Sequence, residues 1–438
     1  MKKGRGPGAG KQKKNLNNHN IKMKIKILSI LTIIVCSINL YGQWISQTSG
    51  TTDTLLSISF PFNVTTGYCA GVSGQNGVVV KTTNGGVNWI YELLSSNIQF
   101  RTVHFPTLNN GWVAGFYNNN GIIMVTTNGG TTWSTQFTGG LIYANFNCIR
   151  FVNILKGWAV TSLGMVYSTT NGGTDWSYVV TSAGNNSLNS ISFANLTTGW
   201  IVGQNSSILK TTNAGINWLM QTVINVTGLN GVDCINDAVC WAVGDLGRVI
   251  KTTNGGSSWF QQLVVPAEKF TSVNFIDLNT GWVTSSNGSI RATTNGGANW
   301  IVQSSGVTTP LRYVVFPMNN GTGWVCGVNG KLLKTINGGF TGIEKISSEI
   351  PHRFSLLQNY PNPFNPVTQI KFQIAKFSNA KLVVFDALGR EVETLVNEQL
   401  KPGTYEAEFE GSKYSSGIYF YKLIAENYTE TKKMILTK

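Results

Sequence analysis

The chain has 438 residues, of which only 12% are charged and 49 are glycine, and its formal net charge is +14. Nine basic residues and no acid lie in the first 26 positions, so the rest holds 24 basic and 19 acidic residues, a net charge of +5. So small an excess excludes a basic stripe for phosphates and argues against nucleic-acid binding. Abundant glycine without helical apolar spacing predicts an all-β fold of short strands and tight turns.

Residues 1–42 are predicted to be an N-terminal extension and a signal peptide. Three lysines between positions 22 and 26 precede an apolar run from Ile27 to Ile38, and Gly42 offers a small residue for cleavage. These are the parts of a secretory signal. The run is shorter than the roughly 20 residues that span a bilayer. We therefore expect an exported mature chain without a transmembrane segment.

One string recurs between residues 43 and 341, and its first copy is TTNGGVNW from Thr82 to Trp89. The period is 41 to 44 residues, which is typical of a propeller blade made of four strands. The asparagine of each copy stands at Asn84, Asn128, Asn171, Asn213, Asn254, Asn295 and Asn337. Seven copies predict a seven-bladed β-propeller over residues 43–341.

The last copy of the repeat lacks its fourth strand, and the start of the mature chain supplies a substitute. The stretch WISQTSG from Trp44 matches WIVQSSG from Trp300. We expect this N-terminal strand to complete the seventh blade and close the ring, which removes the open edge between the first and last blades.

The 13 tryptophans occupy only two positions of the repeat, one after the turn and one on the second strand. An array of aromatic rings could stack on sugars. Strict periodicity instead favours packing between blades, where each ring buries on the order of 150–250 Å².

The repeat residues Thr82, Asn84, Gly86 and Trp89 resemble the Asp-box (BNR) repeat, with asparagine in place of aspartate. As a whole, residues 43–341 resemble the propeller family of photosystem II assembly and stability factors. The resemblance implies a binding scaffold that holds a client polypeptide on an arginine-rich surface, and it does not imply an enzyme.

Three arginines are the candidate ligand-binding residues. Arg101 and Arg312 take the same position near the start of the first strand of their blades, and Arg248 follows the second strand of the fifth blade. We expect all three to reach one loop face. A guanidinium can donate two hydrogen bonds to one carboxylate, which suits an acidic peptide or a chain end. Ordinary solvated surface arginines are the alternative interpretation.

The alternative function is a carbohydrate-active, sialidase-like propeller acting on extracellular glycans. Such glycosidases need paired carboxylates, and Asp53 and Asp245 are the two candidates for the loop face. The three histidines, His19, His104 and His352, predict no metal cluster. We therefore predict no catalytic residue, no metal and no cofactor.

Cys234 and Cys240 flank the first hairpin of the fifth blade, where other blades carry phenylalanine and usually glycine. Facing strands and an oxidising destination predict a disulfide between them. The sequence leaves open a second bridge between Cys69 and Cys326 on adjacent blades, and Cys148 is expected to be a buried thiol.

Composition changes after position 341, where 11 of the 19 acids lie. We assign residues 342–352 to a linker and residues 353–438 to a C-terminal domain. NYPNPFNP from Asn359, VVFDALGREV from Val383 and SGIYFY from Ser416 resemble, in order, the type A sorting domain of the type IX (Por) secretion system. Alternating apolar strands imply a small Ig-like β-sandwich. The resemblance implies that the outer-membrane secretion machinery is a partner and that the product, which we expect to be a monomer, is secreted or held at the cell surface.

Overall fold

The structure is a computed structural model that describes Met1 and residues 44–438, apart from 119, 140–144, 222–226, 319–320, 340–342, 348 and 413. Its regular elements are β-strands, with one short 3-10 turn, η1 (Asp245–Gly247). The described part of the chain has no helix long and apolar enough to cross a membrane. The extension and signal peptide predicted for residues 1–42 lie, except for Met1, outside the described residues.

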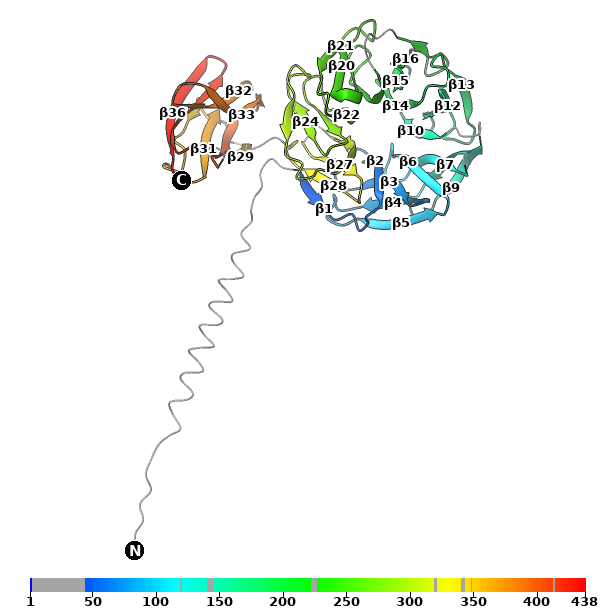
Figure 1. Cartoon of the computed structure of the whole chain (residues 1–438), viewed down its shortest axis with the longest axis horizontal. Helices are drawn as coiled ribbons and strands as arrows, with labels where there is room; N and C mark the ends of the chain where they lie inside the picture. The colour runs from blue at the N-terminus through cyan, green and yellow to red at the C-terminus, as the bar shows by residue number, and fades with distance from the viewer. Residues whose placement is uncertain are drawn as a thin grey trace. The chain divides into compact units, whose positions relative to one another are not determined.

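Residues 44–339 form seven four-stranded antiparallel sheets, which we number in chain order. Sheets 1 to 6 each use four successive strands, and the first strand of each lies innermost (Figure 1). Sheet 1 has β2 (Thr54–Ser59), β3 (Gly67–Ser73), β4 (Asn76–Thr82) and β5 (Ile90–Ser95). Sheet 2 has β6 (Ile98–His104), β7 (Gly111–Tyr117), β8 (Asn120–Thr126) and β9 (Ser134–Gly139). Sheet 3 has β10 (Phe146–Phe151), β11 (Gly157–Thr161), β12 (Met165–Thr169) and β13 (Ser177–Val180).

The next three sheets repeat this order. Sheet 4 has β14 (Leu188–Phe193), β15 (Gly199–Gly203), β16 (Ile208–Thr211) and β17 (Leu219–Met220). Sheet 5 has β18 (Leu229–Cys234), β19 (Cys240–Gly244), β20 (Arg248–Thr252) and β21 (Phe260–Leu263). Sheet 6 has β22 (Phe270–Phe275), β23 (Gly281–Ser285), β24 (Ile290–Thr293) and β25 (Ile301–Gln303).

Sheet 7 combines both ends of this region. It has β26 (Leu311–Val315), β27 (Gly323–Gly327) and β28 (Leu332–Thr335), and its fourth strand is β1 (Ile45–Gln47). In the antiparallel pair, Ile45 lies opposite Lys334, and Figure 1 shows β1, in blue, beside β28, in yellow. The indole of Trp44 donates a hydrogen bond to Gln303 in sheet 6 (2.8 Å).

Neighbouring sheets pack through stacked aromatic rings. A phenylalanine at the end of a first strand stacks on an aromatic ring of the preceding sheet's second strand, with centroids 3.6 to 3.9 Å apart. The pairs are Phe60–Trp324, Phe105–Tyr68, Phe151–Trp112, Phe193–Trp158, Phe275–Trp241 and Phe316–Trp282. The prediction that the second-strand tryptophans pack between sheets is confirmed.

In the six sheets with these pairs, a glycine at the start of the second strand makes the stacking possible. A Cβ added at Gly111 would lie 2.3 Å from the ring of Phe105, and in the other five pairs the corresponding distance is 2.2 to 2.7 Å. Sheet 5 departs from the pattern, because Cys234 and Cys240 replace the phenylalanine and the glycine and are joined by a disulfide. Cys69, Cys148 and Cys326 are buried free thiols, so the second bridge that the sequence left open is not formed.

The C-terminal region forms two four-stranded antiparallel sheets around one apolar core. One sheet has the order β29 (Ile343–Ser347), β34 (Gly403–Glu410), β31 (Val367–Ile374) and β30 (Ser355–Leu356). The other has the order β33 (Glu391–Leu400), β32 (Ser378–Asp386), β35 (Gly417–Ala425) and β36 (Tyr428–Leu436). Strand β29 lies in the range that the sequence suggested as a linker. It pairs with β34 and thereby covers an edge that would otherwise be open.

Candidate binding site

The first strands of all seven sheets line a central cavity with a volume of about 350 Å³. Each first strand shifts register against its second strand at the same place, for example between Phe100 and Thr102 in sheet 2. A β-bulge leaves one residue outside the ladder and redirects its side chain. The seven bulge residues, which we call the bulge ring, are Leu56, Arg101, Asn147, Asn189, Asn230, Thr271 and Arg312. All seven line the cavity.

On sheets 3 to 6 the bulge ring ties each sheet to the next. The side chain of Asn147 donates a hydrogen bond to the carbonyl of Leu188 in sheet 4 (2.8 Å). In the same way, Asn189 donates to the carbonyl of Leu229 in sheet 5, and Asn230 donates to the carbonyl of Phe270 in sheet 6. Thr271 donates to the carbonyl of Leu311 (2.9 Å). These four side chains are therefore committed to holding the sheets together.

The other three members of the bulge ring, Arg312, Leu56 and Arg101, belong to sheets 7, 1 and 2, which contact one another in that order. Arg101 is exposed, and its guanidinium lies 5.7 Å from the centroid of the Phe116 ring. Arg312 is partly buried, and its Nε has no hydrogen-bond partner among the described residues. The structure thus brings two of the three predicted arginines to one ring, on either side of an apolar residue.

The third predicted arginine is not part of the cavity lining. Arg248 begins β20, opposite Gly244, and its Nη1 donates a hydrogen bond to Gln261 (3.4 Å). It follows the hairpin between the second and third strands of sheet 5, so it lies two strands outward from the cavity wall. The sequence places Arg248 in the correct hairpin, but it does not reveal that this hairpin lies outside the cavity wall.

A second ring, three residues further along each first strand, was not predicted to carry function. Its members pair with the aromatic residues of the second strands, and all but Ser192 line the cavity. They are Ser59, His104, Arg150, Ser192, Asp233, Asn274 and Val315. The same alignment that found Arg101 and Arg312 would have found Arg150, the one arginine at this position.

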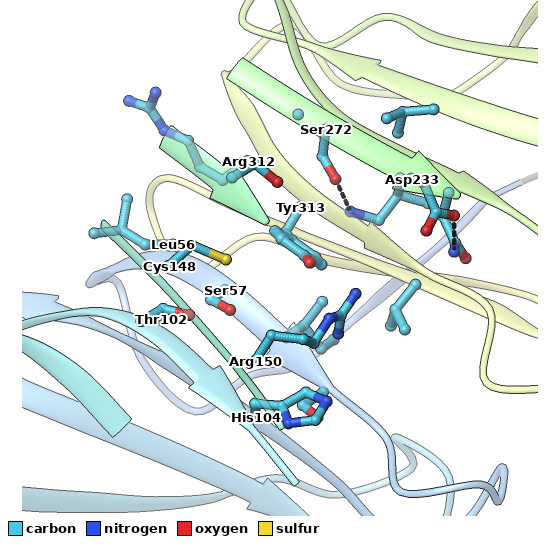
Figure 2. Close-up of a pocket in the computed structure, with 18 of the residues that line it drawn as sticks. Leu56, Ser57, Thr102, His104, Cys148, Arg150, Asp233, Ser272, Arg312 and Tyr313 are labelled. Atoms are coloured by element: carbon cyan, nitrogen blue, oxygen red, sulfur yellow. Dashed lines mark hydrogen bonds between the residues drawn. The ribbon is translucent and has the colours of Figure 1, made fainter. Parts of the chain in front are cut away.

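Most side chains of the second ring accept a backbone N–H from the next sheet. The acceptor and donor pairs are Ser59–Phe105 (3.0 Å), His104–Phe151 (3.2 Å), Ser192–Cys234 (3.2 Å), Asp233–Phe275 (2.7 Å) and Asn274–Phe316 (2.7 Å). Arginine has no acceptor atom, so Arg150 cannot make this contact. Figure 2 shows its side chain extending into the cavity, with the guanidinium close to the hydroxyl of Tyr313.

The charges of this deeper region are set by burial and by Arg150. Burial, and then the positive charge of Arg150, hold the pKa of His104 well below its ordinary value, so the imidazole is neutral at pH 7 and accepts through Nδ1. Burial raises the pKa of Tyr313 to about 12. Burial also raises the pKa of Asp233, and hydrogen bonds from Phe275 and attraction to Arg150 partly offset it.

Arg150 itself stays charged. Burial lowers its pKa, but the neighbouring Tyr313, Cys148 and Asp233 outweigh that effect, so the net shift is upward. No carboxylate of the described residues lies within 4.0 Å of its guanidinium. The cavity therefore contains three arginines on sheets 7, 2 and 3, and Asp233 is the one acid among its described lining residues.

The fold and the cavity are those of an all-β, propeller-like protein. The sequence matches the family described as photosynthesis system II assembly factor YCF48 over residues 37–187 and 179–265, more than half of the chain. The chain belongs to this family. Residues 358–437 match the secretion system C-terminal sorting domain, so the protein is exported by the type IX system to the cell surface or beyond.

Solved structures agree on the fold. A structure of YCF48 bound to D1 peptide has a TM-score of 0.57 and 20% identity, covering 67% of this chain and 94% of that one. YCF48 from Cyanidioschyzon merolae has a TM-score of 0.54 and 20% identity, covering 66% of this chain and 98% of that one. PorZ, a surface component of the type IX secretion system of Porphyromonas gingivalis, has a TM-score of 0.56 and 13% identity, covering 90% of this chain and 60% of that one. No curated protein sequence gives a significant match.

Proposed function

We propose that the protein is an exported, non-enzymatic scaffold that binds an acidic polypeptide segment at the bulge ring. The observation that carries the proposal is the division of this ring into two parts. Four members bridge neighbouring sheets, whereas Arg312, Leu56 and Arg101 form no such bridge among the described residues. Two guanidinium groups flanking an apolar side chain suit carboxylates that are separated by apolar residues.

A polypeptide ligand has support from the family as well. The solved YCF48 complex is described as bound to a D1 peptide, which is a statement about that protein. The present chain shares its fold at 20% identity. The ligand here is accordingly proposed only by its chemistry, an acidic segment with an apolar residue between or beside the acids.

The acids of the propeller-like region give less support to the glycosidase alternative. Glycosidases need two facing carboxylates, and Asp233 alone lines the described part of the cavity. Asp53 accepts a hydrogen bond from Thr51 (2.6 Å), and Asp245 forms an ion pair with Lys269 (2.9 Å). Neither of these two acids belongs to the cavity lining.

We further propose that the seven sheets are the blades of one ring closed by β1, and that residues 343–438 form the sorting domain read by the outer-membrane secretion machinery. The pairing of β1 with β28 and the contacts of β2 with β26 and β27 support the ring. The pairing of β29 with β34 supports a domain that begins at residue 343 rather than at residue 353.

A pull-down tests the proposed function. The mature protein is used as bait against polypeptides of the cell envelope and the medium, beside the Arg101→Ala/Arg312→Ala variant. Arg248→Ala is the matched control, because Arg248 lies outside the cavity lining. We expect the same captured polypeptides with the natural protein and the control and none with the double variant. Equal capture by all three would overturn the proposal.

A further inference from the structure

Arg150 stands out in the cavity because it breaks a structural pattern. In five of the seven sheets the second-ring side chain accepts a backbone N–H from the next sheet. In sheet 3 this bridge is absent, since a guanidinium can only donate. A residue that gives up a repeated structural contact without an evident gain in stability is a candidate for function.

The groups around Arg150 do not neutralise it. Asp233 is engaged elsewhere: it accepts hydrogen bonds from the backbone of Phe275 (2.7 Å), the side chain of Asn274 (3.0 Å) and the backbone of Cys234 (3.2 Å). His104 is neutral and uses Nδ1 to accept from Phe151. The guanidinium therefore lines the cavity without a carboxylate partner among the described residues, and its N–H donors are available to a ligand.

Tyr313 completes the arrangement. Its hydroxyl lies beside the guanidinium of Arg150 (Figure 2), and burial raises its pKa to about 12, so the phenol is neutral at ordinary pH and keeps its proton to donate. A guanidinium fork beside a hydroxyl donor matches the two oxygens of a carboxylate. Figure 2 shows Arg150 and Tyr313 together, while the guanidinium of Arg312 points away from them. The deeper group is thus separate from the arginines of the bulge ring.

We propose that Arg150 and Tyr313 form a carboxylate-binding site deep in the cavity, into which the bound polypeptide inserts one acidic group past the bulge ring. The identity of the ligand as a polypeptide rests on the proposed function, whereas the carboxylate site rests on this cavity alone. Three residues of extended strand separate the two rings, about 10 Å. One acidic side chain or chain end can therefore reach Arg150 while flanking groups stay at the bulge ring.

Small carboxylates test the site without knowledge of the partner. His104 lies beside Arg150, and its pKa is lowered first by burial and then by that charge, so an anion bound at Arg150 is expected to raise the pKa of His104. The pKa of His104 is measured by NMR of its imidazole. We expect acetate to raise this pKa and acetamide to leave it unchanged. His352 is exposed in the C-terminal region and serves as the internal reference. No response to acetate would overturn the proposal.

The matched variant is Arg150→Ser, because serine occupies the same position as Ser59 and Ser192 and restores an acceptor for the next sheet. It should fold and bind acetate at least about tenfold more weakly. The Arg101→Ala/Arg312→Ala variant should bind acetate as the natural protein does, even where it no longer captures a polypeptide. An equal acetate response in Arg150→Ser would contradict the site, and failure of the pull-down alone would contradict only the proposed function.

Three capped tripeptides identify the source of the carboxylate. Ac-Ala-Ala-Asp-NH2 carries a side-chain acid, Ac-Ala-Ala-Ala-OH carries a chain-end acid, and Ac-Ala-Ala-Ala-NH2 carries none. A His104 response to either acidic peptide, but not to the neutral one, supports insertion of a polypeptide acid and says which kind. A response to acetate with none to either acidic peptide would overturn the insertion of a polypeptide group.

Discussion

Lys334 donates a hydrogen bond from Nζ to the backbone carbonyl of Gly85, 2.7 Å away and 249 residues earlier in the chain. The same contact joins Lys81 to Gly129 (2.6 Å), Lys210 to Gly255 (2.7 Å) and Lys251 to Gly296 (2.9 Å). Sheet 7 is therefore tied to sheet 1 by the bond that ties sheet 1 to sheet 2.

This contact predicts that Lys334→Met lowers the free energy of unfolding by about 1–2 kcal/mol, and by at least as much as Lys81→Met does, because the carbonyl of Gly129 keeps a hydrogen bond from the hydroxyl of Tyr68 (3.0 Å). Each change leaves a buried carbonyl without its charged donor while keeping the length of the side chain. Urea denaturation of both variants measures the effect. A cost for Lys81→Met together with none for Lys334→Met would show that the ring is open between sheets 7 and 1.

The disulfide of sheet 5 can be exchanged for the pair found in the other sheets. The double variant Cys234→Phe/Cys240→Gly should place a phenylalanine against the buried Trp200. We expect its free energy of unfolding to lie within about 1 kcal/mol of that of the natural protein and to be unaffected by reductant. Cys234→Phe alone should cost about 1–3 kcal/mol more, because the Cβ of Cys240 would meet the ring. Chemical denaturation with and without reductant makes the comparison. Equal stability of the single and double variants would contradict the packing argument.

Removal of Arg101 and Arg312 should weaken ligand binding and leave thermal stability nearly unchanged. Each lost charged hydrogen bond is expected to cost about 1.5–3 kcal/mol of binding free energy. Added salt should weaken binding by the natural protein, since part of the attraction is screened. Titration of a captured polypeptide against the natural protein, the double variant and Arg248→Ala gives these values. Loss of binding in Arg248→Ala alone would move the site away from the cavity.

The pH dependence of stability reports on His104. Its pKa is lower in the folded protein than the value of about 6.5 in an unfolded chain, so the unfolded state takes up the proton first. The contribution of His104 therefore makes stability fall as pH decreases below about 6.5. Arg150→Ser removes a neighbouring positive charge, so it should raise the pKa of His104 and flatten this fall. Denaturation between neutral and mildly acidic pH measures the slope, and an unchanged slope in Arg150→Ser would show that burial alone sets the pKa.

The sequence by itself determined the all-β, propeller-like fold and the sorting domain. The seven propeller-like sheets share a turn with threonine, asparagine and glycine at alternate positions, and in six of them a tryptophan follows that glycine by three residues. The turn has a local cause. Gly85 and Gly86 adopt positive φ of 67° and 90°, and Thr82 accepts the N–H of Gly86 (2.9 Å) within one turn. Interactions between residues that are close in the chain can be recognised from spacing alone, as can the substitution of Cys234 and Cys240 for phenylalanine and glycine.

Only the tertiary structure decided which cavity residues are available to a ligand. Asn147 and Arg101 occupy equivalent positions in the sequence repeat, yet Asn147 donates a hydrogen bond to the carbonyl of Leu188 in the next sheet, whereas Arg101 forms no such bridge to any described residue. Arg248 lies in the predicted hairpin but outside the cavity lining. Arg150 lines the cavity, although the sequence analysis did not predict it as a site residue. These differences depend on the bulges and on contacts between sheets about 40 residues apart. Such contacts form only when the first strands converge around the cavity, so the local pattern of one repeat does not encode them.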